Sequence, residues 1–429
     1  MKHLIGWLLL IGLLAGASAD LTSYVNAPSP FEWTKSLESK IGESQFVELT
    51  VVSQKWREFT WRHRVRIVKP RELKHTETAI LYITGSGDGR SELQIVARAA
   101  ERVGAIGVIL HDVPNQPLIR PDLVEDNLIA HTYVQFWETG DATWPLLFPM
   151  VKSAVRAMDA VQEFTRKEWG LNIKDFVITG ASKRGWTTWL TAAVDKRARA
   201  IAPMVFDNLN FFAQMPHQLE QWGRYSEQIS EYYTRGLMEK MLTERGRQLV
   251  SWVDPYSYRA RYTMPILIIN GANDPYWTVD AARFYFDDLP SKRKYTLYVP
   301  NGGHNLGGDF DRVINSLSAF YLMSIGKMEF PSQLTATHST AGDEVIYRLR
   351  TDKAPEIVEV WVARRANDTD FRPARWEPVR ARKEGNQWVA RIPRRGDNLA
   401  LFAEVTYRAE TGNFSLCTVP VVVSSSSRK

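Results

Sequence analysis

Short, continuously apolar runs alternate with helix-length segments through the middle of this 429-residue chain. The runs are "TAILYITG", "AIGVILH", "DFVITG", "AIAPMVF", "MPILIING" and "KYTLYVP", and the first two are joined by the helical segment "LQIVARAAERVG". A strand without polar alternation is buried on both faces, which is typical of a parallel sheet covered by helices. The pattern therefore predicts an α/β fold with a mostly parallel sheet.

Two flanking regions have a different pattern. The earlier segments "FVELTVVSQKW" and "WRHRVRIVKP" alternate like two half-exposed antiparallel strands. From about residue 341, short strand-like runs follow one another with only turns between them, which predicts a small β-sandwich. We therefore expect an α/β-hydrolase domain over residues 20–330, with its own core, and a β-sandwich domain over residues 340–424.

The first 19 residues have the features of a secretory signal. Lys2 and His3 precede a short apolar stretch, and Ala17-Ser18-Ala19 provides small residues before Asp20. The apolar stretch is shorter than the ~20 residues of a membrane-spanning helix. We expect export to the periplasm or the exterior after cleavage, and no membrane span.

Composition excludes several classes of function. The net charge of +6 is spread along the chain without a long cationic run, so the sequence predicts no nucleic-acid binding. The histidines are scattered, and we predict no metal site and no cofactor. The single cysteine, Cys417, cannot form an intramolecular disulfide. A small-molecule ester or peptide is the expected partner, while the oligomeric state stays open.

The stretch "FVITGASKRGW" places Ser182 directly after an apolar strand and before a helix, as in the nucleophile elbow of α/β-hydrolases. Two later strands, "MPILIING" and "KYTLYVP", lead directly into Asp274 of "NGAND" and His304 of "NGGH". The order Ser, acid, His is the order along the chain in this fold. We predict a catalytic triad of Ser182, Asp274 and His304. Asp207 in "MVFDN" also follows a strand and is the alternative acid.

An oxyanion hole needs backbone N–H groups near the nucleophile. The N–H of Lys183 follows Ser182 and is the expected first donor, and Ser86 or Gly87 in the loop "TGSGDGR" is the expected second. The Lys183 ammonium could add positive charge there. Arg184 stands where Gly-x-Ser-x-Gly elbows have a small residue, and its simplest interpretation is an outward-facing surface cation.

These segments resemble the family of PhoPQ-activated pathogenicity-related proteins. The resemblance is carried by "LYITGSGDG", the long loop "NQPLIRPDLVEDNLIAHTYVQFWETGDATWPLLFPM", "GASKRGWTTWL", "NGANDPYW" and "NGGHNL". It implies an exported α/β-hydrolase-like protein, related to virulence by the family name, with the Ser182–Asp274–His304 triad and a fused β domain. The "PYW" turn resembles the acid loop of related peptidases and esterases, which favours Asp274 over Asp207.

Two insertions are expected to shape the substrate site, the first within the long loop at about residues 114–143. The second, at about residues 208–262, is predicted to form helices that make a lid over the site. Two functions agree with these observations. The first is an exported serine hydrolase that cleaves an ester or peptide bond through an acyl-enzyme. The second is a non-catalytic secreted binding or signalling protein that retains the hydrolase scaffold.

Overall fold

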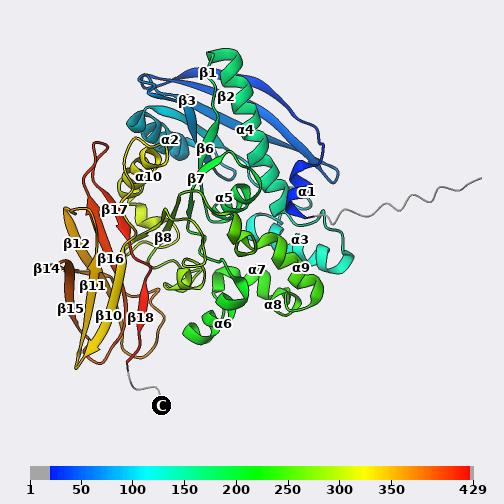
Figure 1. Cartoon of the computed structure of the whole chain (residues 1–429). Coiled ribbons are helices and arrows are strands. Elements are labelled where there is room, and N and C mark those ends of the chain that lie inside the picture. The colour runs from blue at the N-terminus through cyan, green and yellow to red at the C-terminus, as the bar shows by residue number, and fades with distance from the viewer. Residues whose placement is uncertain (1–19, 426–429) are drawn as a thin grey trace, which may run out of the picture.

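The computed structural model describes residues 20–425, so the predicted signal segment at residues 1–19 lies outside the described residues. Most strands join one 14-stranded sheet, in which β1 to β9 run in the order β1-β2-β3-β5-β4-β6-β7-β8-β9 (Figure 1). The six central strands are mutually parallel: β5 (Ala105–Leu110), β4 (His75–Ile83), β6 (Asp175–Ala181), β7 (Ala198–Met204), β8 (Ile266–Gly271) and β9 (Lys294–Val299). The predicted α/β-hydrolase fold is confirmed.

The N-terminal edge of this sheet is antiparallel. The sequence predicts two of its strands, β2 (Ser44–Trp56) and β3 (Phe59–Lys69), and the structure adds β1 (Glu32–Ile41) outside them. Almost every residue of β1 is exposed, so this strand has no apolar alternation by which the sequence could reveal it. The short helix α1 (Leu21–Asn26) precedes β1 and is capped by the side chain of Asp20.

Helices cover both faces of the parallel strands. On one face α2 (Arg90–Val103) packs against α10 (Phe310–Ser324), and on the other α4 (Leu147–Trp169) packs against α5 (Lys183–Val194). The strands between them are buried on both sides, as the continuous apolar runs predict. Between β8 and β9 the chain forms only the 3₁₀ turn η3 (Ala281–Phe284).

The long loop after β5 is not a loop throughout, because it contains the helix α3 (Glu125–Thr139). The buried residues of α3 recur three and four positions apart, a periodicity that could have revealed the helix: Leu128, Ile129, Thr132, Tyr133 and Phe136.

The second insertion is helical. It lies between β7 and β8 and consists of α6 (Phe211–Trp222), η1 (Glu227–Ile229), α7 (Ser230–Tyr233), α8 (Leu237–Lys240), α9 (Glu244–Val253) and η2 (Pro255–Arg261). Its helices gather at the lower end of the molecule in Figure 1, beside α3. We refer to residues 208–262 as the lid.

The C-terminal strands extend the main sheet. β17 (Phe414–Cys417) pairs with β9 through Cys417 and Thr296, and the sheet continues through β16 (Asn398–Tyr407), β12 (Ile357–Arg365) and β13 (Glu377–Arg380). The short β18 (Val421–Val423) pairs with β16. A second sheet contains β10 (Thr335–Ala341), β11 (Glu344–Arg350), β15 (Gln387–Pro393) and β14 (Arg382–Glu384).

One apolar core reaches from the hydrolase region into the C-terminal region. It joins Leu297 of β9 and Phe320 of α10 to Val360 of β12, Leu401 of β16 and Val345 of β11. The division near residues 330–340 stays a prediction, and the structure adds that both sides of this division contribute to the same core.

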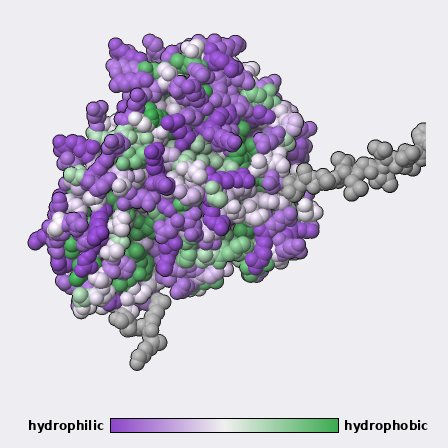
Figure 2. Space-filling view, viewed as in Figure 1, coloured by the Kyte–Doolittle hydropathy of each residue, from purple (hydrophilic) through white to green (hydrophobic). Residues whose placement is uncertain are grey.

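The surface matches this burial. Hydrophilic residues cover most of the face in Figure 2, and a green apolar area lies over the C-terminal strands. Among residues 20–425, no helix has both the length and the apolar character needed to cross a membrane.

We predict that the chain cut after Ser332 loses most of its stability. The cut would expose apolar residues of β9 and α10 that the C-terminal strands cover, and burial of apolar surface contributes about 25 cal/mol per Å². Size-exclusion chromatography and thermal unfolding should show aggregation or a much lower Tm than that of the full chain. A monomer that unfolds cooperatively at the Tm of the full chain would contradict the shared core.

Candidate active site

Ser182 sits on a strained turn between β6 and α5. Its backbone has φ 59° and ψ −126°, a conformation that costs a non-glycine residue free energy and is concentrated at functional sites. Two glycines make the turn possible. A Cβ on Gly180 would lie 2.8 Å from the carbonyl oxygen of Arg184, and one on Gly185 would lie 2.7 Å from that of Met204. The second glycine therefore packs the helix closely against β7.

Three strand ends bring Ser182, His304 and Asp274 together. His304 Nε2 lies 2.9 Å from Ser182 Oγ, and His304 Nδ1 lies 2.8 Å from Asp274 Oδ2. Since a carboxylate only accepts hydrogen bonds, Nδ1 carries a proton and Nε2 is free to accept the serine proton. Asp274 is buried, and its other oxygen accepts the backbone N–H of Tyr276 at 2.9 Å. This arrangement fixes the imidazole between serine and acid.

Asp207, the alternative acid, lies at the end of β7 but is bonded to other groups. Its carboxyl accepts hydrogen bonds from Asn270, at 2.8 Å, and from the hydroxyl of Tyr285. Burial raises the pKa of Asp207 to about 7, so near neutral pH it is only partly ionised. In the described structure the carboxylate that orients His304 is Asp274.

The two cations after Ser182 point inward. The guanidinium of Arg184 makes a bidentate ion pair with Glu125, with distances of 2.7 and 2.8 Å, and donates to the Val113 carbonyl. The Arg184 side chain is only 11% exposed, so its interpretation as a surface cation is wrong. The guanidinium lies against Gly85, where a Cβ would come within 2.3 Å of it.

Lys183 belongs to the same cluster. Its ammonium lies 2.7 Å from Asp126 and 3.1 Å from Glu125, both in the first turn of α3. Burial opposes ionisation of Glu125, but its pairing with Arg184 and Lys183 lowers its pKa to about 2. The Lys183 charge is thus balanced by neighbouring carboxylates.

The predicted oxyanion donors lie at two adjacent strand ends. Lys183 opens α5, so its backbone N–H has no acceptor within the helix. Ile83 pairs with Gly180 across β4 and β6, which places the following loop, with Ser86 and Gly87, at the same edge of the sheet as the elbow. Ser86 and Gly87 are exposed. Their role as oxyanion donors stays a prediction.

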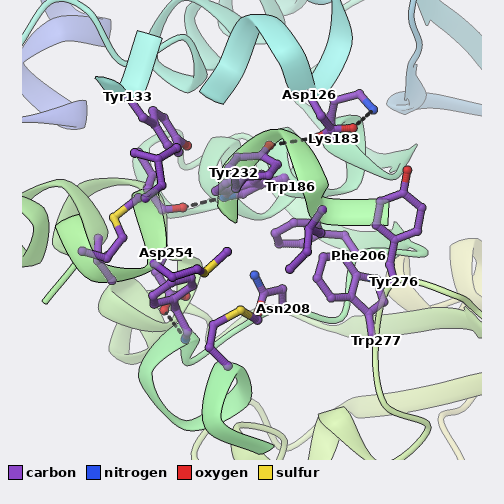
Figure 3. A pocket seen from close by; sticks show the side chains of 18 of the residues that line it. Asp126, Tyr133, Lys183, Trp186, Phe206, Asn208, Tyr232, Asp254, Tyr276 and Trp277 are labelled. Atoms are coloured by element: carbon purple, nitrogen blue, oxygen red, sulfur yellow. Dashed lines mark hydrogen bonds and ion pairs between the residues drawn. The ribbon is translucent and has the colours of Figure 1, made fainter. Parts of the chain in front are cut away.

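An apolar cavity lies between Ser182 and the lid (Figure 3). Its aromatic wall comes from α3, α5, the end of β7, the lid and the loop after β8: Tyr133, Trp186, Phe206, Phe211, Tyr232, Tyr276 and Trp277. The ring of Tyr276 also packs on His304, with centroids 4.1 Å apart. The cavity therefore borders the nucleophile on the side of α3 and the lid.

The loop at residues 366–376, which joins β12 to β13, holds the loops that carry the acid and the histidine. The Asn273 amide donates to three of its carbonyl oxygens, those of Phe371, Arg372 and Ala374, at 3.3, 3.0 and 2.7 Å. Asn301, three residues before His304, exchanges hydrogen bonds of 2.8 and 3.1 Å with the backbone of Trp376. We call residues 366–376 the clamp loop.

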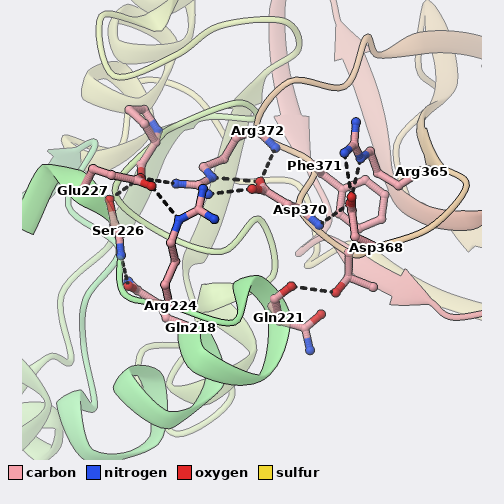
Figure 4. Close-up of polar contacts among 12 residues, drawn as sticks. Gln218, Gln221, Arg224, Ser226, Glu227, Arg365, Asp368, Asp370, Phe371 and Arg372 are labelled. Carbon is pink, nitrogen blue, oxygen red and sulfur yellow. Dashed lines mark hydrogen bonds and ion pairs between the residues drawn. The ribbon is translucent and has the colours of Figure 1, made fainter. Parts of the chain in front are cut away.

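The clamp loop also reaches the lid (Figure 4). Arg372 forms an ion pair of 3.0 Å with Glu227 of η1 and lies over the ring of Trp222, 4.0 Å from its centroid. Thr369 donates to the Gln221 carbonyl at 3.1 Å. Sequence reasoning missed this loop, since side-chain bonds to distant backbone carbonyls leave no periodic pattern.

Residues 20–425 contain no group of three His, Cys, Asp or Glu side chains placed to hold a metal ion.

Comparison with known proteins gives a family and a curated relative. The family model described as PhoPQ-activated pathogenicity-related protein matches residues 21–372. Autocrine proliferation repressor protein A of Dictyostelium discoideum is 36% identical over 390 residues, which are 85% of this chain and 78% of the relative.

Solved structures with a similar arrangement include esterases. Acetyl xylan esterase 1 from Thermoanaerobacterium sp. JW/SL YS485 has 17% identity and a TM-score of 0.44, over 70% of this chain and 93% of its own. An S-formylglutathione hydrolase from Agrobacterium tumefaciens has 10% identity and a TM-score of 0.43, over 67% and 98%. Likeness at this level carries no conclusion about substrate.

We predict that Asn273→Ala lowers the free energy of unfolding by about 1–3 kcal/mol, because it leaves carbonyl groups of the clamp loop without a donor. Urea unfolding measures the change. Asn367→Ala, at an exposed position in the clamp loop, is the control and should change the free energy by about 0.5 kcal/mol or less. Equal stability of the two variants would contradict the role of Asn273.

Proposed function

The chain belongs to the family of PhoPQ-activated pathogenicity-related proteins, and from this premise we propose that it is a serine hydrolase that cleaves an ester or peptide bond. The observation that carries the proposal is the pair of hydrogen-bond distances, 2.9 and 2.8 Å, that link Ser182 through His304 to Asp274. A strained elbow that exposes the serine to a cavity supports it.

In the proposed reaction, Ser182 Oγ attacks the substrate carbonyl carbon while His304 Nε2 takes its proton. Asp274 keeps the imidazole in the required tautomer and stabilises the imidazolium. The oxyanion accepts hydrogen bonds from the Lys183 N–H and from the loop of Ser86 and Gly87. The intermediate collapses as His304 protonates the leaving alcohol or amine, and water then hydrolyses the acyl-enzyme by the same route.

We assign no catalytic part to the Lys183 ammonium. Its pairing with Asp126 and Glu125 supports a structural role, in which it holds α3 against the elbow. Export to the periplasm or the exterior is also part of the proposal and rests on the sequence of residues 1–19 alone.

A second candidate function is that of a secreted binding or signalling protein without turnover. It is favoured by the name of the curated relative, an autocrine proliferation repressor, which describes an effect on cells and no reaction. The two candidates differ in the reactivity of Ser182.

We predict that a fluorophosphonate forms a covalent adduct with Ser182, because His304 activates its hydroxyl. Ser182→Ala should abolish labelling with an unchanged circular dichroism spectrum, and Ser339→Ala, at an exposed serine of β10, should label like the wild type. An unlabelled wild-type protein would favour the non-catalytic candidate. Labelling of the Ser182→Ala variant would refute the nucleophile.

The acid is tested by comparing Asp274→Asn with Asp207→Asn. Loss of the carboxylate that accepts from His304 Nδ1 should lower kcat on the order of 10⁴-fold, as for an orienting acid whose removal leaves the wrong tautomer. Asp207→Asn should keep kcat within about ten-fold, since its carboxyl bonds to Asn270 and Tyr285 instead. The reverse order would exchange the two assignments.

A further inference from the structure

We propose that the cavity beside Ser182 is an acyl pocket, and that the substrates are esters of apolar acids larger than acetic acid. This inference rests on the proposed serine hydrolase function and names its substrate class. Three features support it: the mostly apolar lining of the cavity, the position of the cavity relative to Ser182 and His304, and the bonds that the charged groups around it form with the protein.

Most of the cavity wall is apolar. Besides its seven aromatic rings it contains flexible and branched aliphatic side chains, all of them from the lid: Met215, Ile229, Leu237, Met238, Met241, Val250 and Val253. Methionine side chains adapt their shape to an apolar guest. Three polar wall atoms, on Tyr133, Asn208 and Trp277, have no hydrogen-bond partner, but each is itself buried and adds no polar surface to the cavity.

The position of His304 distinguishes the acyl side from the leaving-group side. The leaving group must take its proton from His304 Nε2, so it lies on the side of Ser182 where the imidazole is. The His304 side chain is 25% exposed and is not among the described residues that line the cavity, whereas Tyr276, whose ring packs on the imidazole, belongs to the cavity wall. We therefore assign the cavity to the acyl group and the exposed face of His304 to the leaving group.

The charges at the cavity are all engaged by the protein. Lys183 and Asp126 form an ion pair of 2.7 Å, and Asp126 also accepts the hydroxyl proton of Tyr232 at 2.9 Å. Asp254 accepts the backbone N–H groups of Asn210, Phe211 and Tyr256 at 3.2, 2.9 and 2.9 Å. A charged acyl group would have to compete with these protein contacts for Lys183, Asp126 or Asp254, so the pocket favours an uncharged apolar group.

The contact between Tyr232 and Asp126 joins the lid to α3, and Asp126 in turn pairs with Lys183 of the elbow (Figure 3). Arg235, on the same segment of the lid, bonds to Asn127 of α3. These contacts keep the apolar wall in place over Ser182, which excludes water from the acyl side.

The test is a series of p-nitrophenyl esters, from acetate through butanoate and hexanoate to octanoate, with the full chain. A buried methylene contributes about 0.8 kcal/mol. We expect kcat/KM to rise roughly ten-fold for each added pair of methylenes until the cavity is filled. A series that is flat or falls from acetate onward would overturn the pocket assignment.

Two lid variants localise the effect. Met238→Trp fills the cavity and should lower the octanoate-to-acetate ratio of kcat/KM at least ten-fold. Leu242→Trp places the same side chain on the same lid, at a residue that is 59% exposed, and should keep the wild-type ratio. Equal ratios in the two folded variants would overturn the proposal. If Met238→Trp does not fold, the wild-type series still decides.

Fluorophosphonate labelling separates this proposal from the proposed function. Failure of Ser182 to label would refute the serine hydrolase itself. Labelling of Ser182 together with a flat ester series, or with no hydrolysis of any ester, would leave the reactive serine in place and overturn the acyl pocket.

Discussion

The arrangement of the site depends on His304, whose imidazole forms hydrogen bonds to Ser182 and Asp274 at the same time. Its partners lie at the ends of different strands, Ser182 after β6 and Asp274 after β8, while His304 itself follows β9. Parallel strands bring these ends to one edge of the sheet, but the sheet alone does not fix loops to within a few tenths of an ångström. The fixing comes from Asn273 and Asn301, which bind the acid and histidine loops to the clamp loop.

The elbow is fixed by a different device, a cluster of buried charges. Lys183 and Arg184 face Glu125 and Asp126, so two cations and two carboxylates are brought together beside the nucleophile. Burying one such charge alone would be costly, and the mutual pairing offsets that cost. Because the acids stand in the first turn of α3, where the helix dipole favours negative charge, the cluster also fixes the beginning of that helix.

The sequence predicted the features that depend on apolar periodicity and on the order of residues along the chain. The apolar runs revealed the parallel strands, and the residues that follow three of them are Ser182, Asp274 and His304, which the structure brings together. Patterns failed where a contact joins distant polar groups. Arg184 points inward because it pairs with Glu125, 59 residues earlier. The Asn273 amide donates to carbonyl oxygens about 100 residues later. The exposed strand β1 has no periodic signal at all.

The lid is fixed by apolar burial and by polar contacts to α3, to the clamp loop and to the loop after β8. Tyr232 bonds to Asp126 on the elbow side, and Glu227 pairs with Arg372 on the clamp-loop side, where Glu227 is 54% exposed. Exposed ion pairs are weak, at about 0–1 kcal/mol, whereas the sheet is fixed by apolar burial on both faces. The lid is therefore held mainly by buried contacts, among them the hydrogen bond of 2.7 Å that buried Ser226 donates to the carbonyl of Pro275, next to Asp274. Because this contact joins the lid to the loop that carries Asp274, the position of the lid and the geometry of the triad are coupled.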